Sequence, residues 1–493
     1  MQELLSRESP LIVAWGLMVT LWLFAGGGFA ADSWLTLLGG REIVAHGVPH
    51  HDWLAIVSHG REWIDQQWLG QLFYYGLYKL GGLSLVSRGN VVLFAAAAAL
   101  ALVAARRSGA SPTRVLVCAV PALLLTGSFV RTQVAAELLF VLLLILLVRE
   151  SRKPSRRILF AFPLLMLWGN VHGSAVIGAA MLSLLGFVEL VRAVRHPRVR
   201  RVARPSLLVL GAWPCLLVTP YATDVVRYYH ATLANPAFAK YITEWQAPKF
   251  TTFWGVIFFV AAFFAAFVVG RRPRDFNAFE LGVLLITFLA GLLAVRSAVW
   301  FAYAVLLLVP RAIEKLWPPR RRSRTARVPF RAAVATLLLG TSLFFLFQPA
   351  RGIGVDWPGA ATRAVAAAVK ADSSLRVLSN EEYADWLLFR ERGLRERVAF
   401  DGRWEILRPG EMSAVVDFLF KQTPEWERMS RGYGLFVLDP KTNRRVVETY
   451  SRRGDMLSLY RDKRVAVFER RSSAQMAGET HSSDQPAKRP QRG

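Results

Sequence analysis

Cysteine and acidic residues are scarce in this sequence, and each shortage narrows the class of protein. Only two cysteines, Cys118 and Cys215, occur among 493 residues, and both lie in apolar stretches where a free thiol behaves as a small hydrophobic side chain. They therefore indicate no disulfide framework. Asp and Glu number 35 against 61 Lys and Arg, which gives a formal net charge of +26. The basic residues form short clusters between apolar runs, a distribution that argues against a nucleic-acid partner.

Several functional motifs are also missing. The sequence has no internal repeat and no Gly-rich phosphate loop. The His and acidic residues of 31–88 match no closed metal-site spacing, although imidazole and carboxylate groups keep a divalent metal open as an alternative. The two halves show no matching pair of Gly/Pro-broken spans, so a transporter ranks lowest among the function classes considered.

Long apolar runs are what the sequence does have. Hydrophobic residues make up 54% of the chain, and they gather in segments close to the ~20 residues that a bilayer crossing needs. We therefore predict that residues 1–349 form an all-α polytopic membrane domain. The predicted spans are 11–30, 89–105, 113–130, 133–148, 158–170, 174–191, 205–221, 252–270, 276–295, 297–314 and 328–348. A cleaved signal peptide is the alternative for the first span, since small residues stand near Ala30.

Alternate connections between these spans are rich in Lys and Arg. The basic connections are 106–107, 149–157, 192–204, 270–274 and 311–331. The positive-inside rule places them in the cytoplasm with the amino end, and places the intervening segments and the C-terminal region outside. We expect a multi-pass protein of a bacterial plasma (inner) membrane.

Two hairpins between basic connections are short and carry polar residues at their tips. Their arms have about 15 apolar residues, or ~22 Å, against a hydrocarbon core of ~30 Å. Arg131 and Glu137 lie on one tip, and Asn170 and His172 on the other. Polar groups at that depth need partners or water, so we expect an outward-facing cavity with these residues on its floor. Local thinning of the bilayer is the alternative.

The outer segments are expected to hold short helices and the remaining candidate residues. In 31–88, helices are predicted at 33–44, with Asp32 as N-cap, and at 64–80. A second outer segment, 221–250, holds Glu244. Residues 350–471 alternate between helical and strand patterns, which predicts a small α/β domain, and the polar tail 472–493 is expected to be disordered. Its strands are predicted at 376–380, 397–400, 434–439 and 464–470.

Asp32 is the candidate catalytic residue because it stands where a span meets the outer face. A carboxylate there can accept a proton from an acceptor hydroxyl, although a helix cap is the simpler interpretation. Arg296, nearly alone between two apolar runs, can hold a lipid phosphate or merely reach toward the interface. The substrate-binding candidates are Asp52, Asp65, Arg131, Glu137, Asn170, His172, Glu244 and Arg296, and no metal ligand is assigned.

The first span, Asp32 and the long outer loop that ends near Lys79-Leu80-Gly81-Gly82 resemble the GT-C superfamily of membrane glycosyltransferases. That superfamily includes protein O-mannosyltransferases and aminoarabinose transferases. The sequence is also similar to a group of uncharacterised bacterial membrane proteins through its motifs Trp168-x-Asn170-x-His172-Gly173, Ile242-x-Glu244-Trp245 and Asp401-Gly402-Arg403. The superfamily resemblance implies that Asp32 is a catalytic base and that the donor is a sugar on a polyprenyl phosphate.

These expectations define one leading function and one alternative of another class. The leading function is an inverting transfer of a sugar from a polyprenyl-phosphate carrier in the bilayer to an acceptor on the outer face. Asp32 would accept the proton, and Arg131 or Arg296 would hold the carrier phosphate. The alternative is a non-catalytic scaffold or envelope-assembly protein that retains the fold. The sequence assigns neither the sugar nor an oligomeric state.

Overall fold

The computed structural model describes residues 11–13, 15–16, 19, 28–126, 129–195, 202–233, 235–318 and 359–471. These residues form two compact units. The helical unit contains the described chain up to His50 and from Ile64 to residue 318, and the second unit contains His51–Trp63 together with residues 359–471. The predicted span 328–348, the tail 472–493 and most of the predicted span 11–30 lie outside the described residues.

Helix α2 (Ala31–His46) lies where the short helix 33–44 was predicted. Helix α3 (Trp68–Arg107) combines the predicted short helix 64–80 and the predicted span 89–105. Helix α3 is broken at Gly81 and Gly82, where Gly82 has φ +64°, a left-handed conformation that glycine adopts without a steric penalty. The prediction of Asp32 as N-cap is wrong, because α2 begins at Ala31 and Asp32 lies in its first turn. Ser33 Oγ accepts the Ala30 backbone N–H instead, at 3.0 Å.

Both predicted hairpins are present as helix pairs. The first pair is α4 (Pro112–Leu125) and α5 (Thr132–Arg152). In the second, η1 (Arg156–Phe160) and α6 (Ala161–Val171) precede α7 (Ala175–Arg195), so the prediction of two helices within 158–191 is confirmed. The next predicted span is shorter, because α8 (Ala203–Ala212) gives way to η3 (Pro214–Leu217), where Pro214 has no N–H for an α-helical bond.

The remaining elements of the helical unit follow the predicted order of outer segment and apolar helices. The segment predicted to be outside contains η4 (Ala222–Asp224), α9 (Val225–Leu233), α10 (Pro236–Tyr241) and η5 (Thr243–Trp245). It is followed by α11 (Phe253–Arg271), η6 (Pro273–Asp275), α12 (Ala278–Leu293), η7 (Val295–Ser297), α13 (Ala298–Leu308) and α14 (Pro310–Leu316).

The described helices support a multi-pass membrane protein. Four of them, α3, α5, α7 and α11, are long and apolar enough to cross a membrane, and counting each bent helix pair as one span raises the number to six. Shorter apolar helices, α4 and α12, accompany them. The total of eleven spans stays a prediction.

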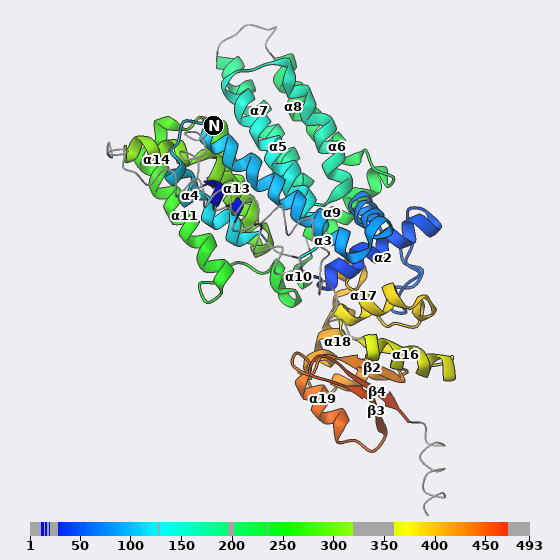
Figure 1. Cartoon of the computed structure of the whole chain (residues 1–493). Coiled ribbons are helices and arrows are strands. Elements are labelled where there is room, and N and C mark those ends of the chain that lie inside the picture. Colours follow the sequence, from blue (N-terminus) through cyan, green and yellow to red (C-terminus); the bar gives the residue numbers. More distant parts are fainter. Residues whose placement is uncertain are drawn as a thin grey trace, which may run out of the picture. The chain divides into compact units, whose positions relative to one another are not determined.

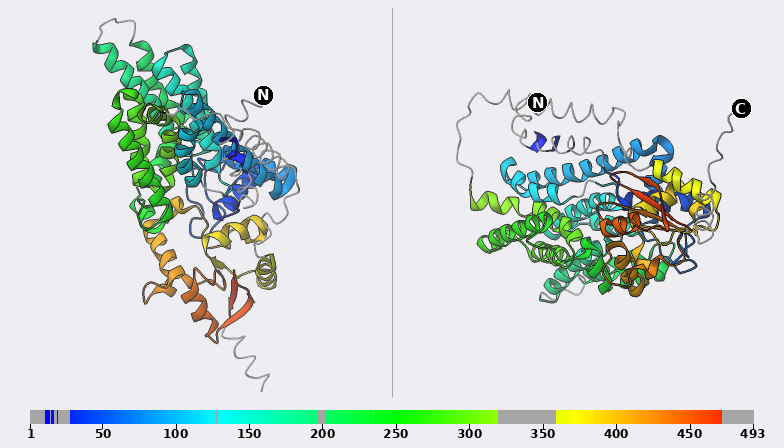
Figure 2. Two further views of the ribbon diagram at one scale, coloured as in Figure 1. Left: turned by 60° about the vertical axis from the view of Figure 1, so that its left-hand side comes forward. Right: turned by 90° about the horizontal axis from the view of Figure 1, so that it is seen from below.

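Helix α13 occupies the centre of the helical unit. All eleven of its residues are buried, as expected of a helix that is apolar on every side. Phe140 of α5, Trp168 of α6 and Trp300 of α13 lie with ring centroids 5.2–6.1 Å apart. Helices α7 and α8 run side by side along the same unit (Figures 1 and 2).

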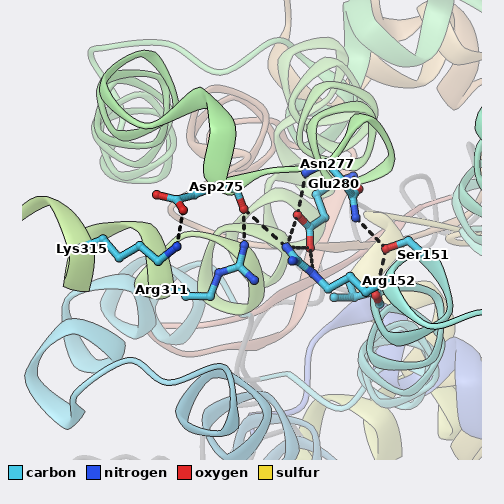
Figure 3. Close-up of polar contacts among 8 residues, drawn as sticks. Ser151, Arg152, Asp275, Asn277, Glu280, Arg311 and Lys315 are labelled. Atoms are coloured by element: carbon cyan, nitrogen blue, oxygen red, sulfur yellow. Dashed lines mark hydrogen bonds and ion pairs between the residues drawn. The ribbon is translucent and has the colours of Figure 1, made fainter.

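At the end where the basic connections emerge, ion pairs join different helices (Figure 3). Arg152 of α5 donates to both carboxylate oxygens of Glu280 on α12, at 2.5 and 2.6 Å. Glu280 also accepts the Asn277 N–H, while Asn277 Oδ1 accepts the Glu280 N–H, which forms a reciprocal cap at the start of α12. Asp275 is paired with Lys315, and its carbonyl accepts from Arg311.

The second unit contains a four-stranded sheet in the order β1-β2-β4-β3. Strands β1 (Val377–Ser379) and β2 (Leu435–Leu438) are parallel, and β4 (Ala466–Arg470) pairs antiparallel with β2 and with β3 (Met456–Arg461). The accompanying helices are α16 (Gly359–Ala371), α17 (Glu381–Arg390), α18 (Pro409–Phe420) and α19 (Arg444–Ser451). The predicted strand 397–400 is reduced to isolated bridges at Val398, and β3 was not predicted.

Candidate functional site

Arg131, the residue before α5, brings together two carboxylates from distant parts of the helical unit. Its Nη1 and Nη2 donate to Glu244 Oε2 and Oε1 at 3.1 and 2.8 Å, a two-point ion pair with η5. Its Nε lies 3.3 Å from Asp32 Oδ2 in the first turn of α2. Three of the sequence-predicted residues, Asp32, Arg131 and Glu244, therefore form one cluster.

The backbone around Arg131 is fixed from two sides. Ser33 Oγ donates to the Val130 carbonyl at 2.8 Å, which ties the start of α2 to the residue beside Arg131. The hydroxyl of Tyr74, on α3, lies 2.6 Å from Asn90 Oδ1 and 3.0 Å from the Arg131 carbonyl, and its single proton is shared between these two acceptors. These contacts hold the guanidinium in position before any ligand arrives.

Both carboxylates of the cluster are accessible to solvent. The side chains of Asp32 and Glu244 are 48% and 40% exposed, whereas that of Arg131 is 20% exposed. Burial raises the pKa of Glu244, but the charge and hydrogen bonds of Arg131, assisted by Arg296, outweigh burial and hold that pKa below its ordinary value. The cluster therefore presents two partly open carboxylates around one cation.

Arg296 lies next to this cluster, close enough for its charge to influence Glu244. Its guanidinium stacks 4.8 Å above the ring of Trp245, the residue after Glu244. The Val295 N–H donates to the Gln246 carbonyl at 2.9 Å, which joins η7 to the end of η5. Within the described part of the chain, no carboxylate lies at ion-pair distance from Arg296. This cation is therefore available to an anionic ligand.

The second hairpin tip supplies a separate, mostly buried polar group. Asn170 Oδ1 accepts from Trp68 Nε1 at 2.7 Å, and Asn170 Nδ2 donates to the Val218 carbonyl at 2.8 Å. His172 Nδ1 lies 2.8 Å from Ser174 Oγ. Asn170 and His172 are 7% and 8% exposed. The structure thus gives both residues a role in shaping the tip.

The two hairpin tips meet at the start of α3. Gly70 is packed so closely there that a Cβ would come within 2.8 Å of Thr132 Cγ2 and 3.0 Å of the Val171 carbonyl. Gln67 hydrogen-bonds Thr132, and Gln66 Nε2 donates to the Gly169 carbonyl at 2.7 Å. Sequence reasoning missed Gln66, Gln67 and Trp68, although their position opposite two polar tips was the available signal.

Three predicted residues lie apart from the Arg131 cluster. Glu137, on α5, is 1% exposed and accepts a long contact of 3.4 Å from the Tyr303 hydroxyl. Asp65 is buried and accepts from Gln71 at 2.9 Å. Asp52 belongs to the second unit, where it pairs with Arg403 at 2.7 Å. Among the described residues, no group of three or more His, Cys, Asp or Glu side chains is arranged to hold a metal ion.

The order of elements and their packing correspond to the fold of a solved aminoarabinose transferase. The chain is similar to the crystal structure of the aminoarabinose transferase ArnT from Cupriavidus metallidurans bound to undecaprenyl phosphate, with a TM-score of 0.50, 15% identity and coverage of 94% of this chain and 98% of that chain. The apo state of ArnT superposes with a TM-score of 0.42 at 15% identity, over 93% and 97% of the two chains. No family model and no curated protein matches the sequence. The predicted resemblance is confirmed at the level of the fold.

Proposed function

We propose that this chain is a membrane glycosyltransferase that moves a sugar from a polyprenyl-phosphate carrier to an acceptor hydroxyl on the extracytoplasmic face of a bacterial inner membrane. The observation that carries the proposal is the cluster of Asp32, Arg131 and Glu244 beside Arg296, which has no carboxylate at ion-pair distance among the described residues, in a chain with an ArnT-like fold. The similar ArnT structure has undecaprenyl phosphate bound, which supports a lipid-phosphate donor.

In this proposal Asp32 is the general base. Arg131 Nε lies 3.3 Å from Oδ2 of the carboxylate, and in this proposal Oδ1 is the oxygen that accepts the acceptor proton. The acceptor oxygen then forms a bond to the anomeric carbon, while the bond from that carbon to the carrier phosphate breaks and the phosphate leaves with the electron pair. Because attack and departure are on opposite faces of the sugar, the configuration inverts.

Arg296 is the preferred residue for the carrier phosphate. Arg131 already shares its donors between two carboxylates, and bringing a phosphate to it would require displacing one of them. Arg296 offers a guanidinium above an aromatic ring and carries no such competition within the described residues. A cation at this point stabilises the negative charge that develops on the leaving phosphate.

The test uses the purified full chain, labelled polyprenyl-phosphate sugars and detection of released polyprenyl phosphate. Asp32→Asn should slow transfer by about 10²- to 10⁴-fold, the usual contribution of a general base. Asp224→Asn is a matched control, because Asp224 is also an outer-segment carboxylate paired with an arginine, Arg227, but lies outside the cluster. An Asp32→Asn protein that keeps its melting temperature and the parent rate would overturn the proposal.

One observation favours the alternative of a non-catalytic scaffold. The Arg131 cluster joins α2, α5 and η5 and can hold three segments of the helical unit together without chemistry. A scaffold predicts that neither the parent nor Asp32→Asn releases carrier. It also predicts that Asp32→Asn changes the melting temperature. The same set of assays therefore separates the two functions.

A further inference from the structure

Residues His51–Trp63, although they stand between α2 and α3 in the sequence, are part of the second unit. The Ile56 and Val57 N–H groups donate to the carbonyls of Val398 and Ala399 at 2.9 and 3.0 Å, and the Glu396 N–H donates to the Leu54 carbonyl at 2.9 Å. Val398 also bridges Val377 of β1, so this segment extends the sheet beyond β1. We call residues 51–63 the inserted segment.

Arg403 fixes the inserted segment by its side chain. Its Nη2 donates to Asp52 Oδ1 at 2.7 Å, its Nε donates to Asp401 Oδ1 at 2.8 Å, and its guanidinium stacks 4.3 Å above the ring of Trp63. The side chains of Arg403, Asp52 and Asp401 are 1%, 0% and 3% exposed. Arg403 thus holds both ends of the segment, through Asp52 and Trp63.

A second, more exposed ion pair repeats this attachment near the C-terminal end of the segment. Arg61 donates through both Nη atoms to the carboxylate of Glu411 on α18, at 2.7 and 2.6 Å. Arg61 also donates to the Ile406 carbonyl at 3.1 Å. The two partners are 24% and 27% exposed, so either can be replaced without opening the core of the second unit.

The residues that flank the inserted segment hold the hairpin tips of the helical unit. Before the segment, the Pro49 carbonyl accepts from the Tyr221 hydroxyl at 2.7 Å. After it, Gln66 is bonded to Gly169, Gln67 to Thr132 beside Arg131, and Trp68 to Asn170. Only two residues, Ile64 and Asp65, separate Trp63, at the end of the inserted segment, from Gln66. A shift of the segment end at Trp63 is therefore transmitted to the neighbours of Arg131 and Asn170 through very few rotatable bonds.

We infer that the C-terminal domain positions the transfer site through the inserted segment, with Arg403 and the Arg61–Glu411 pair as positioning residues. The inference rests on the proposed function. In this inference, residues 359–471 influence the transfer site without contacting the sugar or the carrier. They set the place and rigidity of residues 64–68, and these in turn set the hairpin tip that ends at Arg131.

The experiment lengthens the connection without disturbing the attachment. Insertion of Gly-Ser-Gly-Ser between Trp63 and Ile64 in the full chain leaves every contact of Arg403 and Arg61 intact but frees residues 64–68. We expect kcat to fall by at least about tenfold with little change in the KM for the donor, since small displacements of a reacting group have effects of this size or larger. Hydrogen exchange of peptides that cover 64–68 and 131–133 should accelerate.

The matched control is the same insertion after Gly454, an exposed residue in the turn before β3. It should leave kcat within about twofold of the parent. Arg61→Glu and Glu411→Arg test the attachment itself. Each single variant should accelerate exchange at 64–68 and lower kcat, and the double variant, which restores an ion pair of reversed order, should recover both.

The outcomes separate this inference from the proposed function. If the parent releases no carrier, the proposed function fails, while hydrogen exchange still reports whether the segment controls residues 64–68. If the parent transfers sugar and the insertion at Trp63 behaves as the insertion at Gly454 does, in both rate and exchange, the positioning role is wrong. Failure of the double variant to recover exchange at 64–68 would count against the Arg61–Glu411 pair.

Discussion

The two ends of helix α5 carry similar ion pairs in different surroundings. At its amino end, Arg131 is shared by two carboxylates that are 48% and 40% exposed. At its carboxyl end, Arg152 binds Glu280, which is 3% exposed (Figure 3), and Glu150, which is 0% exposed, accepts from Arg204 and from the N–H and hydroxyl of Ser155. The buried carboxylates have their oxygens occupied by donors and are closed to solvent, whereas Asp32 and Glu244 keep part of their surface open to solvent although Arg131 contacts both. The burial of the carboxylate and the occupancy of its oxygens by hydrogen-bond donors, and not its charge alone, therefore distinguish a structural ion pair from a candidate site.

The largest expected effect of this difference is on stability. Glu280→Gln should lower the free energy of unfolding by roughly 1.5–3 kcal/mol, because it weakens charge-assisted hydrogen bonds to a carboxylate that is 3% exposed, whereas Arg152, at 38% exposed, regains water. Glu244→Gln, the matched change at the other end, should cost less than about 1 kcal/mol, as half-exposed pairs do. Unfolding of both proteins in the same detergent measures the two losses. Equal losses would remove the distinction between the two ends.

The next effect concerns binding at the open end. Arg296→Gln should raise the KM for a polyprenyl-phosphate donor by roughly ten- to a hundredfold, since a hydrogen bond to a charged group contributes about 1.5–3 kcal/mol. Arg272→Gln is the control, because Arg272 lies at the basic end, where its Nε is 3.3 Å from Asp275. Steady-state kinetics with varied donor provide the measurement. A normal KM for the Arg296 variant would assign the phosphate to another cation.

The smallest effect is expected in the second unit, where Glu405 represents a third case, a partly buried carboxylate for which desolvation outweighs the nearby charge of Arg403. Burial raises the pKa of Glu405 from 4.5 to about 6, against the opposing influence of Arg403. Below pH 4.5 the group is neutral in both states. As the pH rises from 4.5 to 6, the unfolded chain ionises first and stability falls, and above pH 6 the loss is constant.

Glu405→Gln should therefore be more stable than the parent above pH 6 by about 1 kcal/mol, and equal to it below pH 4.5. Thermal unfolding of the full chain across pH 4 to 8, followed on the transition of the second unit, gives the comparison. A variant whose stability runs parallel to the parent over this whole range would show that Glu405 is solvated in the folded protein.

Sequence reasoning predicted the helices that are defined by local pattern. The hairpins α4–α5 and α6–α7 follow from apolar runs between basic clusters, because charge in the loops and hydrophobicity in the arms both act locally. Strand β3 was missed because it is half exposed and therefore lacks a clear alternation of apolar and polar residues. The predicted strand 397–400 has the right composition but forms only bridges at Val398.

The candidate site was predictable residue by residue but not as an arrangement. Asp32, Arg131 and Glu244 were each singled out for their position at the outer ends of apolar segments. Their convergence on one guanidinium depends on the path of 221–250, which tertiary packing determines. The pairing of Asp52 with Arg403 could not be found from the sequence at all, because the two residues are 351 positions apart and belong to segments with unrelated patterns.

That separation has a consequence for biosynthesis. The inserted segment leaves the ribosome long before its partners Val398, Ala399 and Arg403 are synthesised. At about 5–20 residues per second, the wait between Asp52 and Arg403 is roughly 20–70 s. During this interval the helices that follow the inserted segment are synthesised, while the segment itself still lacks its partners in residues 359–471. A nascent protein stopped before residue 403 would therefore carry Asp32 and Arg131 but not the Asp52–Arg403 pair that fixes the loop between α2 and α3.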